Sequence, residues 1–160
     1  MHMREMKDSD IGAVARLLER LARDYFLDTC SPEQASTFVR DNDETAIRRL
    51  AGEGYVYHVA DDGGHVAGFI AVREGRHVYH LFVDSACHRR GVGRMLWEHA
   101  RAAAVARGGD GCFTVNASNY AVAMYEALGF VRTAPMQTKN GLQFNPMVFP
   151  ASAAHLVGAP

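Results

Sequence analysis

The sequence contains no long hydrophobic run, no large excess of one charge and no cysteine pattern typical of a metal site. Its apolar stretches fall short of the roughly 20 residues that a membrane-spanning helix needs, and the opening MHMREMKDSD is too polar for a secretory signal. The net charge of -1 gives no overall attraction to nucleic acid or anionic lipid. We therefore expect a cytoplasmic protein with neither membranes nor nucleic acid among its partners.

The three cysteines, Cys30, Cys87 and Cys112, are odd in number and lack metal-ligand spacing. We expect free thiols in a reducing compartment, and no bound metal. The chain has 160 residues, of which 48% are hydrophobic and 22% charged, as in one ordinary globular domain. We assign residues 1–149 to this domain and residues 150–160 to a loosely held C-terminal tail.

Hydrophobic periodicity and turn residues predict a mixture of helices and strands. Helices are expected over Ile11–Tyr25, Pro32–Arg40, Asp43 or Glu44 to Ala51, Gly91–Arg107 and Tyr120–Leu128, the last of them capped by Ser118 or Asn119. In the helix over Gly91–Arg107, the apolar stripe is Val92, Leu96, His99, Ala100 and Ala103. Strands are expected over His2–Met6, Tyr55–Ala60, His65–Arg73, His77–Val83, Cys112–Asn116, Phe130–Ala134 and Leu142–Phe149.

The connections between these strands predict a mixed sheet. Short turns, one of them Asp61-Asp62-Gly63-Gly64, join the three strands between Tyr55 and Val83 into an antiparallel meander. A helix joins His77–Val83 to Cys112–Asn116, and a right-handed crossover of this kind makes the two strands parallel. Ligands of open α/β sheets bind beyond the carboxyl ends of parallel strands, which places a site beside Val83 and Asn116.

The most informative stretch is His77–Ala104, which runs from an apolar strand through a turn into a long helix. The first N–H groups of a helix have no partner within it, so they favour an anion. Gly91 and Gly93 lack a Cβ and let a phosphate approach, and three arginines add charge: Arg89, Arg90 and Arg94. The turn indicates a diphosphate site, although ordinary turn chemistry and solvated arginines give the same pattern.

The turn HRRGVGR resembles the acyl-CoA-binding motif of the GNAT family of N-acetyltransferases, which reads Gln or Arg, two residues, Gly, any residue, Gly or Ala. Gly91 and Gly93 match this motif, while His88 stands where Gln or Arg is usual. A second stretch, Thr114–Phe130, resembles the later part of GNAT enzymes through Asn119, Tyr125 and Gly129-Phe130. The resemblance covers about residues 3–149.

This resemblance implies an α/β (α+β) GNAT fold: a mixed, mostly antiparallel sheet of about seven strands, a splayed parallel pair in its middle, and helices on both faces. It also implies acetyl-CoA as cosubstrate. Tyr125 would face the thioester sulfur, asparagine would contact the pantetheine arm, and a bulge would expose backbone N–H groups near Phe82 and Val83. The implied cofactor-binding residues are Phe82, Val83, His88, Arg89, Arg90, Gly91, Val92, Gly93, Arg94, Asn116, Asn119 and Tyr125.

Two histidines of the strand His77–Val83 are candidates for the catalytic base. Strand alternation puts His77 on one face with Tyr79, Leu81 and Val83, and His80 on the other with Val78 and Phe82. His77 stands where some family members have a glutamate base, and His80 is its competitor. An unperturbed histidine is largely neutral at pH 7. A structural histidine, or deprotonation by a water chain, would be equally compatible with the sequence.

We therefore expect a single-domain N-acetyltransferase that moves the acetyl group of acetyl-CoA directly to a primary amine of a small molecule or peptide. No cysteine stands where a covalent acyl carrier is expected, which favours a ternary complex. A catalytically degenerate, acetyl-CoA-binding regulatory module is the alternative. Nucleic-acid binding by HRRGVGR is disfavoured by the low net charge. The acceptor and the oligomeric state stay open, with a homodimer as one expectation.

Overall fold

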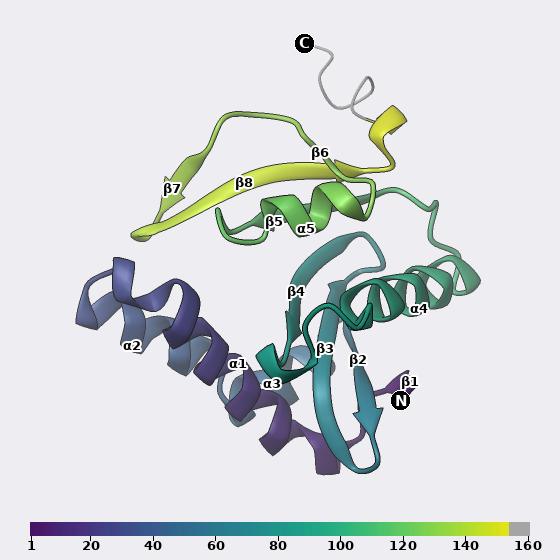
Figure 1. The fold of residues 1–160 in the computed structure, drawn as a ribbon, viewed down its shortest axis with the longest axis horizontal. Helices are drawn as coiled ribbons and strands as arrows, with labels where there is room; N and C mark the ends of the chain where they lie inside the picture. Colours follow the sequence, from purple (N-terminus) through teal and green to yellow (C-terminus); the bar gives the residue numbers. More distant parts are fainter. Residues whose placement is uncertain (154–160) are drawn as a thin grey trace.

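A computed structural model describes residues 1–153 of the protein, which form one eight-stranded sheet with helices on both faces (Figure 1). The strand order is β1-β2-β3-β4-β5-β8-β6, and β7 pairs with β8 off this path. β4 and β5 are the parallel pair, and every other pairing is antiparallel. The predicted mixed sheet with a central parallel pair is confirmed, with eight strands instead of about seven.

The first half of the sheet contains the predicted meander of β2 (Tyr55–Asp62), β3 (His65–Arg73) and β4 (His77–Val83). Strand β1 (His2–Glu5) pairs with β2 at its edge. Strand β2 runs two residues beyond its expected end, so the β2–β3 turn is only Gly63-Gly64. Both glycines have positive φ, 63° and 93°, which a side chain would disfavour. The Gly64 N–H donates to Asp61 Oδ1 at 2.7 Å and holds this turn.

Helices α1 (Ile11–Tyr25) and α3 (Glu44–Ala51) cover one face of this half-sheet, and α4 (Val92–Ala106) covers the other (Figure 1). Between α1 and α3 lies α2 (Pro32–Asp41), which has no buried residue and begins with a capping box from Ser31. The apolar stripe of α1 packs on Tyr57, Val59 and Phe69 of the sheet. Four short 3-10 helices complete this inventory: Asp8–Asp10, Leu27–Thr29, Ser85–Cys87 and Ala151–Ala153.

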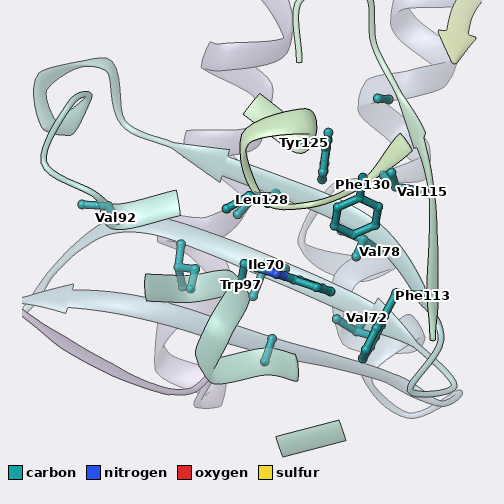
Figure 2. Close-up of a cluster of buried hydrophobic side chains, with 14 of the residues drawn as sticks. Ile70, Val72, Val78, Val92, Trp97, Phe113, Val115, Tyr125, Leu128 and Phe130 are labelled. Carbon is teal, nitrogen blue, oxygen red and sulfur yellow. The ribbon is translucent and has the colours of Figure 1, made fainter. Parts of the chain in front are cut away.

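The second half of the sheet consists of β5 (Phe113–Ala117), β6 (Val131–Arg132), β7 (Gln137–Lys139) and β8 (Leu142–Phe149). It packs against α4 through Trp97, whose ring centroid lies 4.9 Å from that of Phe113 and 5.0 Å from that of Phe130 (Figure 2). The Phe149 ring centroid lies 5.1 Å from it. The apolar stripe predicted for α4 omitted Trp97, which is only 1% exposed. It included His99 and Ala103, which are not fully buried, and omitted Ala104, which is. The short strand β7 was also not predicted.

Helix α5 (Val122–Ala127) is shorter than expected, and its predicted caps are wrong. Its N-cap is Ala121, which makes no side-chain capping bond, because the Asn119 side chain bonds to β8 instead. Of the expected tail, the start is ordered, since Ala151–Ala153 forms a helical turn with Ala153 buried. Residues 154–160 lie outside the described residues. Within residues 1–153, no helix is long and apolar enough to span a membrane.

Candidate active site

The parallel strands β4 and β5 separate soon after they meet. They pair only at His77–Thr114 and Val78–Val115, after which β4 continues to Val83 without β5 beside it. A cleft of about 1410 Å³ opens at this divergence, lined by residues of the α1–α2 region, β4, the turn before α4, the β5–α5 segment and the β7–β8 hairpin. The parallel strands therefore supply an open backbone edge in the middle of the sheet.

A β-bulge at Tyr79 changes which face each β4 side chain occupies. In the register with β3, Val78 lies opposite Val72 and His80 lies opposite Ala71, so Tyr79 is the extra residue. As a result, Val78 and Leu81 pack on the same face against α4, while Tyr79 and Phe82 pack on the opposite face. The predicted alternation is therefore wrong for Val78 and Tyr79 but holds from Leu81 to Val83, and the bulge itself lies at Tyr79.

The backbone of β4 beyond this bulge offers one N–H to the cleft near its end. The Asp84 N–H donates to Ala67 O of β3 at 2.9 Å. Because successive N–H groups of a strand point to opposite edges, the Val83 N–H is directed toward the cleft and that of Phe82 toward β3. Val83 can thus donate to a bound molecule through its backbone.

The turn before α4 has the geometry of an anion cradle. Gly91 is the N-cap of α4 with φ 74°, a left-handed conformation that favours glycine, and a Cβ built there would meet nothing within 4 Å. A Cβ at Gly93 would contact Met124 Sδ at 3.7 Å and Val83 Cγ2 at 3.8 Å, on the wall of the cleft. The unpaired N–H groups at the start of α4 therefore lie beside open space.

The basic residues of this turn have different surroundings. His88 Nε2 donates to Val83 O at 2.9 Å, and Arg94 donates to Ala127 O at 2.7 Å, which ties α4 to α5. Arg90 lies outside the cleft lining, with Nη1 3.7 Å from Cys87 Sγ. Arg89 lines the cleft and, within residues 1–153, forms neither an ion pair nor a side-chain hydrogen bond. Arg89 is thus the guanidinium best placed to bind an added anion.

A buried aspartate that the sequence analysis did not single out holds the end of β4. Asp84 is 6% exposed, accepts hydrogen bonds from Ala86 N–H at 3.1 Å and Arg20 at 3.0 Å, and lies 3.5 Å from His65 Nε2. Burial alone would raise its pKa, but the bonds from Ala86 and Arg20 lower the pKa below its ordinary value. The carboxylate therefore stays charged and links α1 to the turn.

Tyr125 of α5 combines a packed ring with access to the cleft. It is 4% exposed, its ring meets Phe130 edge to face at 5.3 Å, and it lines the cleft (Figure 2). Burial raises the pKa of its hydroxyl well above the ordinary value. The phenol is consequently protonated at neutral pH and can donate a proton or hydrogen bond.

The two candidate asparagines both line the cleft, but Asn119 is already engaged with β8. Its Nδ2 donates to Gln143 Oε1 at 2.8 Å, and its Oδ1 accepts from Asn145 Nδ2 at 2.8 Å. Asn145 is 1% exposed and also donates to Ala117 O at 3.1 Å. This chain of amides replaces the capping role predicted for Asn119 and fixes the β5–α5 loop against β8.

The two candidate bases lie in different places. His77 lies outside the cleft lining, with Nδ1 2.7 Å from Thr114 Oγ1, and burial lowers its pKa to about 4. His80 lines the cleft, and burial, with a smaller effect of His77, lowers its pKa to about 3. Both imidazoles are therefore neutral at pH 7, and only His80 faces the space where a ligand would bind.

Asn42, which the sequence analysis also missed, determines the tautomer of His80. Its Nδ2 donates to Phe38 O at 2.9 Å, so its Oδ1 is the atom that lies 2.7 Å from His80 Nε2. An amide oxygen can only accept, so His80 Nε2 carries the proton and Nδ1 keeps a lone pair. Asn42 is 4% exposed, which protects this arrangement from water. His80 is thereby prepared to accept a proton through Nδ1.

The structure thus brings most of the predicted site residues to one cleft and leaves two outside it. Those outside are His77 and Arg90. Those that line the cleft are His80, Phe82, Val83, His88, Arg89, Gly91, Val92, Gly93, Arg94, Asn116, Asn119 and Tyr125.

The chain is similar to known acetyltransferases in sequence and in fold. A family model described as an acetyltransferase (GNAT) domain matches residues 26–150. A GCN5-related N-acetyltransferase from Rhodopseudomonas palustris superimposes with a TM-score of 0.76 at 25% identity, covering 92% of this chain and 93% of that chain. No curated protein matches the sequence.

Two further solved structures show the same fold at lower identity. The PaiA N-acetyltransferase from Thermoplasma acidophilum, solved in complex with coenzyme A, has a TM-score of 0.73 at 13% identity and covers 92% of this chain and 96% of that chain. A ribosomal-protein-alanine N-acetyltransferase from Brucella melitensis has a TM-score of 0.68 at 17% identity, with 92% and 98% covered.

Proposed function

The chain belongs to the GNAT family of acetyltransferases, and from this membership we propose that it moves the acetyl group of acetyl-CoA directly to a primary amine within a ternary complex. It is an acyltransferase, and acetyl-CoA supplies the activated acetyl group as a thioester. The observation that carries the proposal is the continuous cleft at the β4–β5 divergence. That cleft joins an anion-binding turn at one end to His80 and Tyr125 in its interior.

The cofactor half of the cleft, as we call Arg89 and residues 91–94 together with the facing residues of α5, would hold the diphosphate and pantetheine arm. The N–H groups at the start of α4 and the Arg89 guanidinium supply positive charge for the diphosphate. The Val83 N–H supplies a donor for an amide or thioester carbonyl beside the strand edge. Support comes from the chemistry of these donors, which match an anionic, amide-bearing ligand.

His80 acts on the attacking amine in this proposal. Its neutral imidazole accepts a hydrogen bond at Nδ1 and orients the nitrogen toward the thioester carbon. Once the new N–C bond forms, the positively charged nitrogen is far more acidic than the free ammonium, and its proton passes through the His80 imidazole to water. We propose His80 rather than His77 for this role because His80 lines the cleft.

Tyr125 acts on the leaving group. As the C–S bond breaks, the Tyr125 hydroxyl donates a proton to the sulfur, and the phenolate takes up a proton from solvent because burial raises its pKa. The products are an acetylated amide and the free thiol of coenzyme A. The amine loses one proton and the sulfur gains one, so the reaction balances. A thiol of pKa about 8.5 is already a fair leaving group, which makes this contribution modest.

The decisive experiment measures thiol release from acetyl-CoA with a broad panel of primary amines, with mass spectrometry of the acetylated product. Direct transfer predicts initial-rate lines that intersect when both substrates are varied. Parallel lines would indicate an acetylated enzyme instead and would overturn the ternary complex. Calorimetric binding of acetyl-CoA without thiol release from any amine would identify a degenerate regulatory module and overturn the enzymatic proposal.

A further inference from the structure

The cleft has a second half that the cofactor half does not use. It is lined by the end of α1, by α2, by the inner residues of β4 and by the β7–β8 hairpin. We call this the acceptor half. An amine that attacks a thioester lying along the β4 edge must approach from the side opposite the turn before α4. The side chains of the acceptor half therefore determine which amine is accepted.

Aromatic rings surround His80 in the acceptor half. Phe38 lies edge on to the imidazole with the ring centroids 6.3 Å apart, and Phe82 lies 5.5 Å away. Phe26 meets Phe38 at 5.2 Å and Phe82 at 6.4 Å. All three phenylalanines are only half-buried and line the cleft. Contact with an apolar or aromatic ligand would remove these ring surfaces from water, which is favourable.

Carboxylates are scarce in the same half. Within residues 1–153, Glu33 and Asp41 are the only acidic residues that line the cleft, and Lys139 lies among the hairpin residues. Glu33 and Asp41 are eight positions apart on α2, which separates them by roughly 12 Å along the helix axis. They cannot hold one ammonium together. A molecule with several ammonium groups would therefore leave some charges unpaired.

Two contacts between distant segments narrow the space around these rings. The turn of the β7–β8 hairpin reaches α2 (Figure 1), where a Cβ at Gly141 would clash with the Gln34 side chain. On the other side, Tyr25 at the end of α1 stacks on Tyr120 of the β5–α5 loop, with ring centroids 4.3 Å apart. The acceptor half is bounded at both places, which favours a compact substrate.

We propose that the acceptor is a compact primary amine with one positive charge and an aromatic body, of the arylalkylamine class. Its ring lies against Phe26, Phe38 and Phe82, and its nitrogen lies at His80. This inference rests on the proposed transfer to an amine and names the substrate of that same site. Polyamines and aminoglycosides are excluded as good acceptors, because they carry several ammonium groups and no aromatic ring.

The test compares primary amines that carry an aromatic ring and one ammonium group with amines that carry several ammonium groups and no ring. With the full chain and saturating acetyl-CoA, kcat/KM for 2-phenylethylamine should exceed that for 1,4-diaminobutane and spermidine by about tenfold or more, the order expected for an apolar pocket. Phe38→Ala should lower kcat/KM for 2-phenylethylamine by roughly 10- to 100-fold while leaving the KM for acetyl-CoA unchanged. Phe38→Leu, which keeps apolar volume, should lose less.

A matched control and a folding check accompany these variants. Val105 is 46% exposed on α4 and does not line the cleft, so Val105→Ala should keep the wild-type preference. An unchanged KM for acetyl-CoA in Phe38→Ala shows that the fold is intact. Higher kcat/KM with spermidine than with 2-phenylethylamine would overturn the inference, and so would an unaltered ring preference in both Phe38 variants.

Equilibrium binding separates this inference from the proposed function. Binding of 2-phenylethylamine to the protein loaded with coenzyme A is measured by saturation-transfer NMR, in the wild type and in Phe38→Ala. Binding that Phe38→Ala abolishes, without thiol release, would support the acceptor class and overturn the transfer reaction. Acetylation of polyamines with no binding of 2-phenylethylamine would overturn the acceptor class and support the transfer.

Discussion

The two halves of the cleft are built in different ways. The cofactor half depends on backbone: a left-handed glycine, the start of a helix and a strand edge freed by the divergence of β4 and β5. The acceptor half depends on side chains from separate elements, with Phe26 and Phe38 near α2, Phe82 on β4 and Gly141 at the hairpin. A backbone site suits one constant ligand, whereas a side-chain site can change its ligand by substitution alone.

The largest effect is expected in the cofactor half, at Gly91. Gly91→Glu places a side chain on a left-handed residue and a negative charge beside the expected diphosphate, so the KM for acetyl-CoA should rise by about a hundredfold or more. Initial-rate kinetics at a fixed amine concentration measure this. An equally large effect on the amine KM alone would show that the two halves are assigned the wrong way round.

Gly63 offers a matched control for Gly91. It also has positive φ, 63° against 74°, and in neither case would a Cβ meet any atom within 4 Å. Gly63→Glu should therefore cost a similar backbone strain of about 1 kcal/mol in the free energy of unfolding. Its KM for acetyl-CoA should stay at the wild-type value, because Gly63 lies in the β2–β3 turn and does not line the cleft.

The next largest effect is expected at His80. His80→Gln should lower kcat by roughly a hundredfold, the lower range for a general base, with little change in the KM for acetyl-CoA. His77→Gln is the matched variant on the same strand and should keep kcat within a few fold. If His77→Gln proves the more damaging substitution, with its fold intact by circular dichroism, the assignment of the base reverses.

A smaller effect is expected at Tyr125. Tyr125→Phe removes the donor to the leaving sulfur but keeps the ring packed on Phe130, so kcat should fall about tenfold with little loss of stability. An acyl donor with a more acidic thiol should restore most of the rate, because its thiolate leaves without a proton. Equal losses with both donors would remove Tyr125 from the chemistry and leave it a core residue.

The smallest effect is a shift in pH dependence, expected from Asn42→Asp. A carboxylate 2.7 Å from His80 Nε2, where the Asn42 Oδ1 now lies, would raise the pKa of His80 from its value of about 3. The neutral imidazole is the active form, so activity should fall off at a higher pH on the acidic side than in the wild type. Rates measured between pH 5 and 9 reveal this, with Asn42→Leu as the variant that lacks a charge.

An unshifted acidic limb in Asn42→Asp would show that Asn42 does not act through His80. Both Asn42 variants should keep the wild-type KM for acetyl-CoA, because Asn42 touches the acceptor half only. A change confined to kcat and its pH profile therefore sharpens the contrast between the two halves.

The sequence predicted the strand, turn and helix that form the cofactor half well, and it predicted the side-chain arrangement of the acceptor half hardly at all. Gly91 and Gly93 lie within three residues of each other between a recognisable strand and helix, so the turn has a local signal. Most helices and strands also have one, and their limits agree within about two residues at the elements that carry the site. The central parallel pair follows from the order strand, helix, strand in the chain, because a crossover through a helix joins two strands that run in the same direction.

What the sequence could not predict depends on contacts between distant residues. The bulge at Tyr79 is a register shift against β3, and one extra residue leaves no local pattern in the strand. Asn42 lies in a short connection, and its importance comes from His80, which is far away along the chain. Asn119 fits a helix cap by its position, but the neighbouring strand β8 offers its side chain two amide partners.

The short seam between β4 and β5 has a consequence for the cohesion of the molecule. Within residues 1–153, the strand ladder joins the two half-sheets at two residue pairs, and the other contacts between them come largely from side chains, such as the packing around Trp97, the Arg94 bond to Ala127 O and the stacking of Tyr25 on Tyr120. A long ligand that binds both sides of the seam acts as a cross-link between two units that would otherwise open locally at lower free energy. Binding of such a ligand would therefore raise the free energy of local opening between the two half-sheets, so the protein would be most stable with the ligand bound.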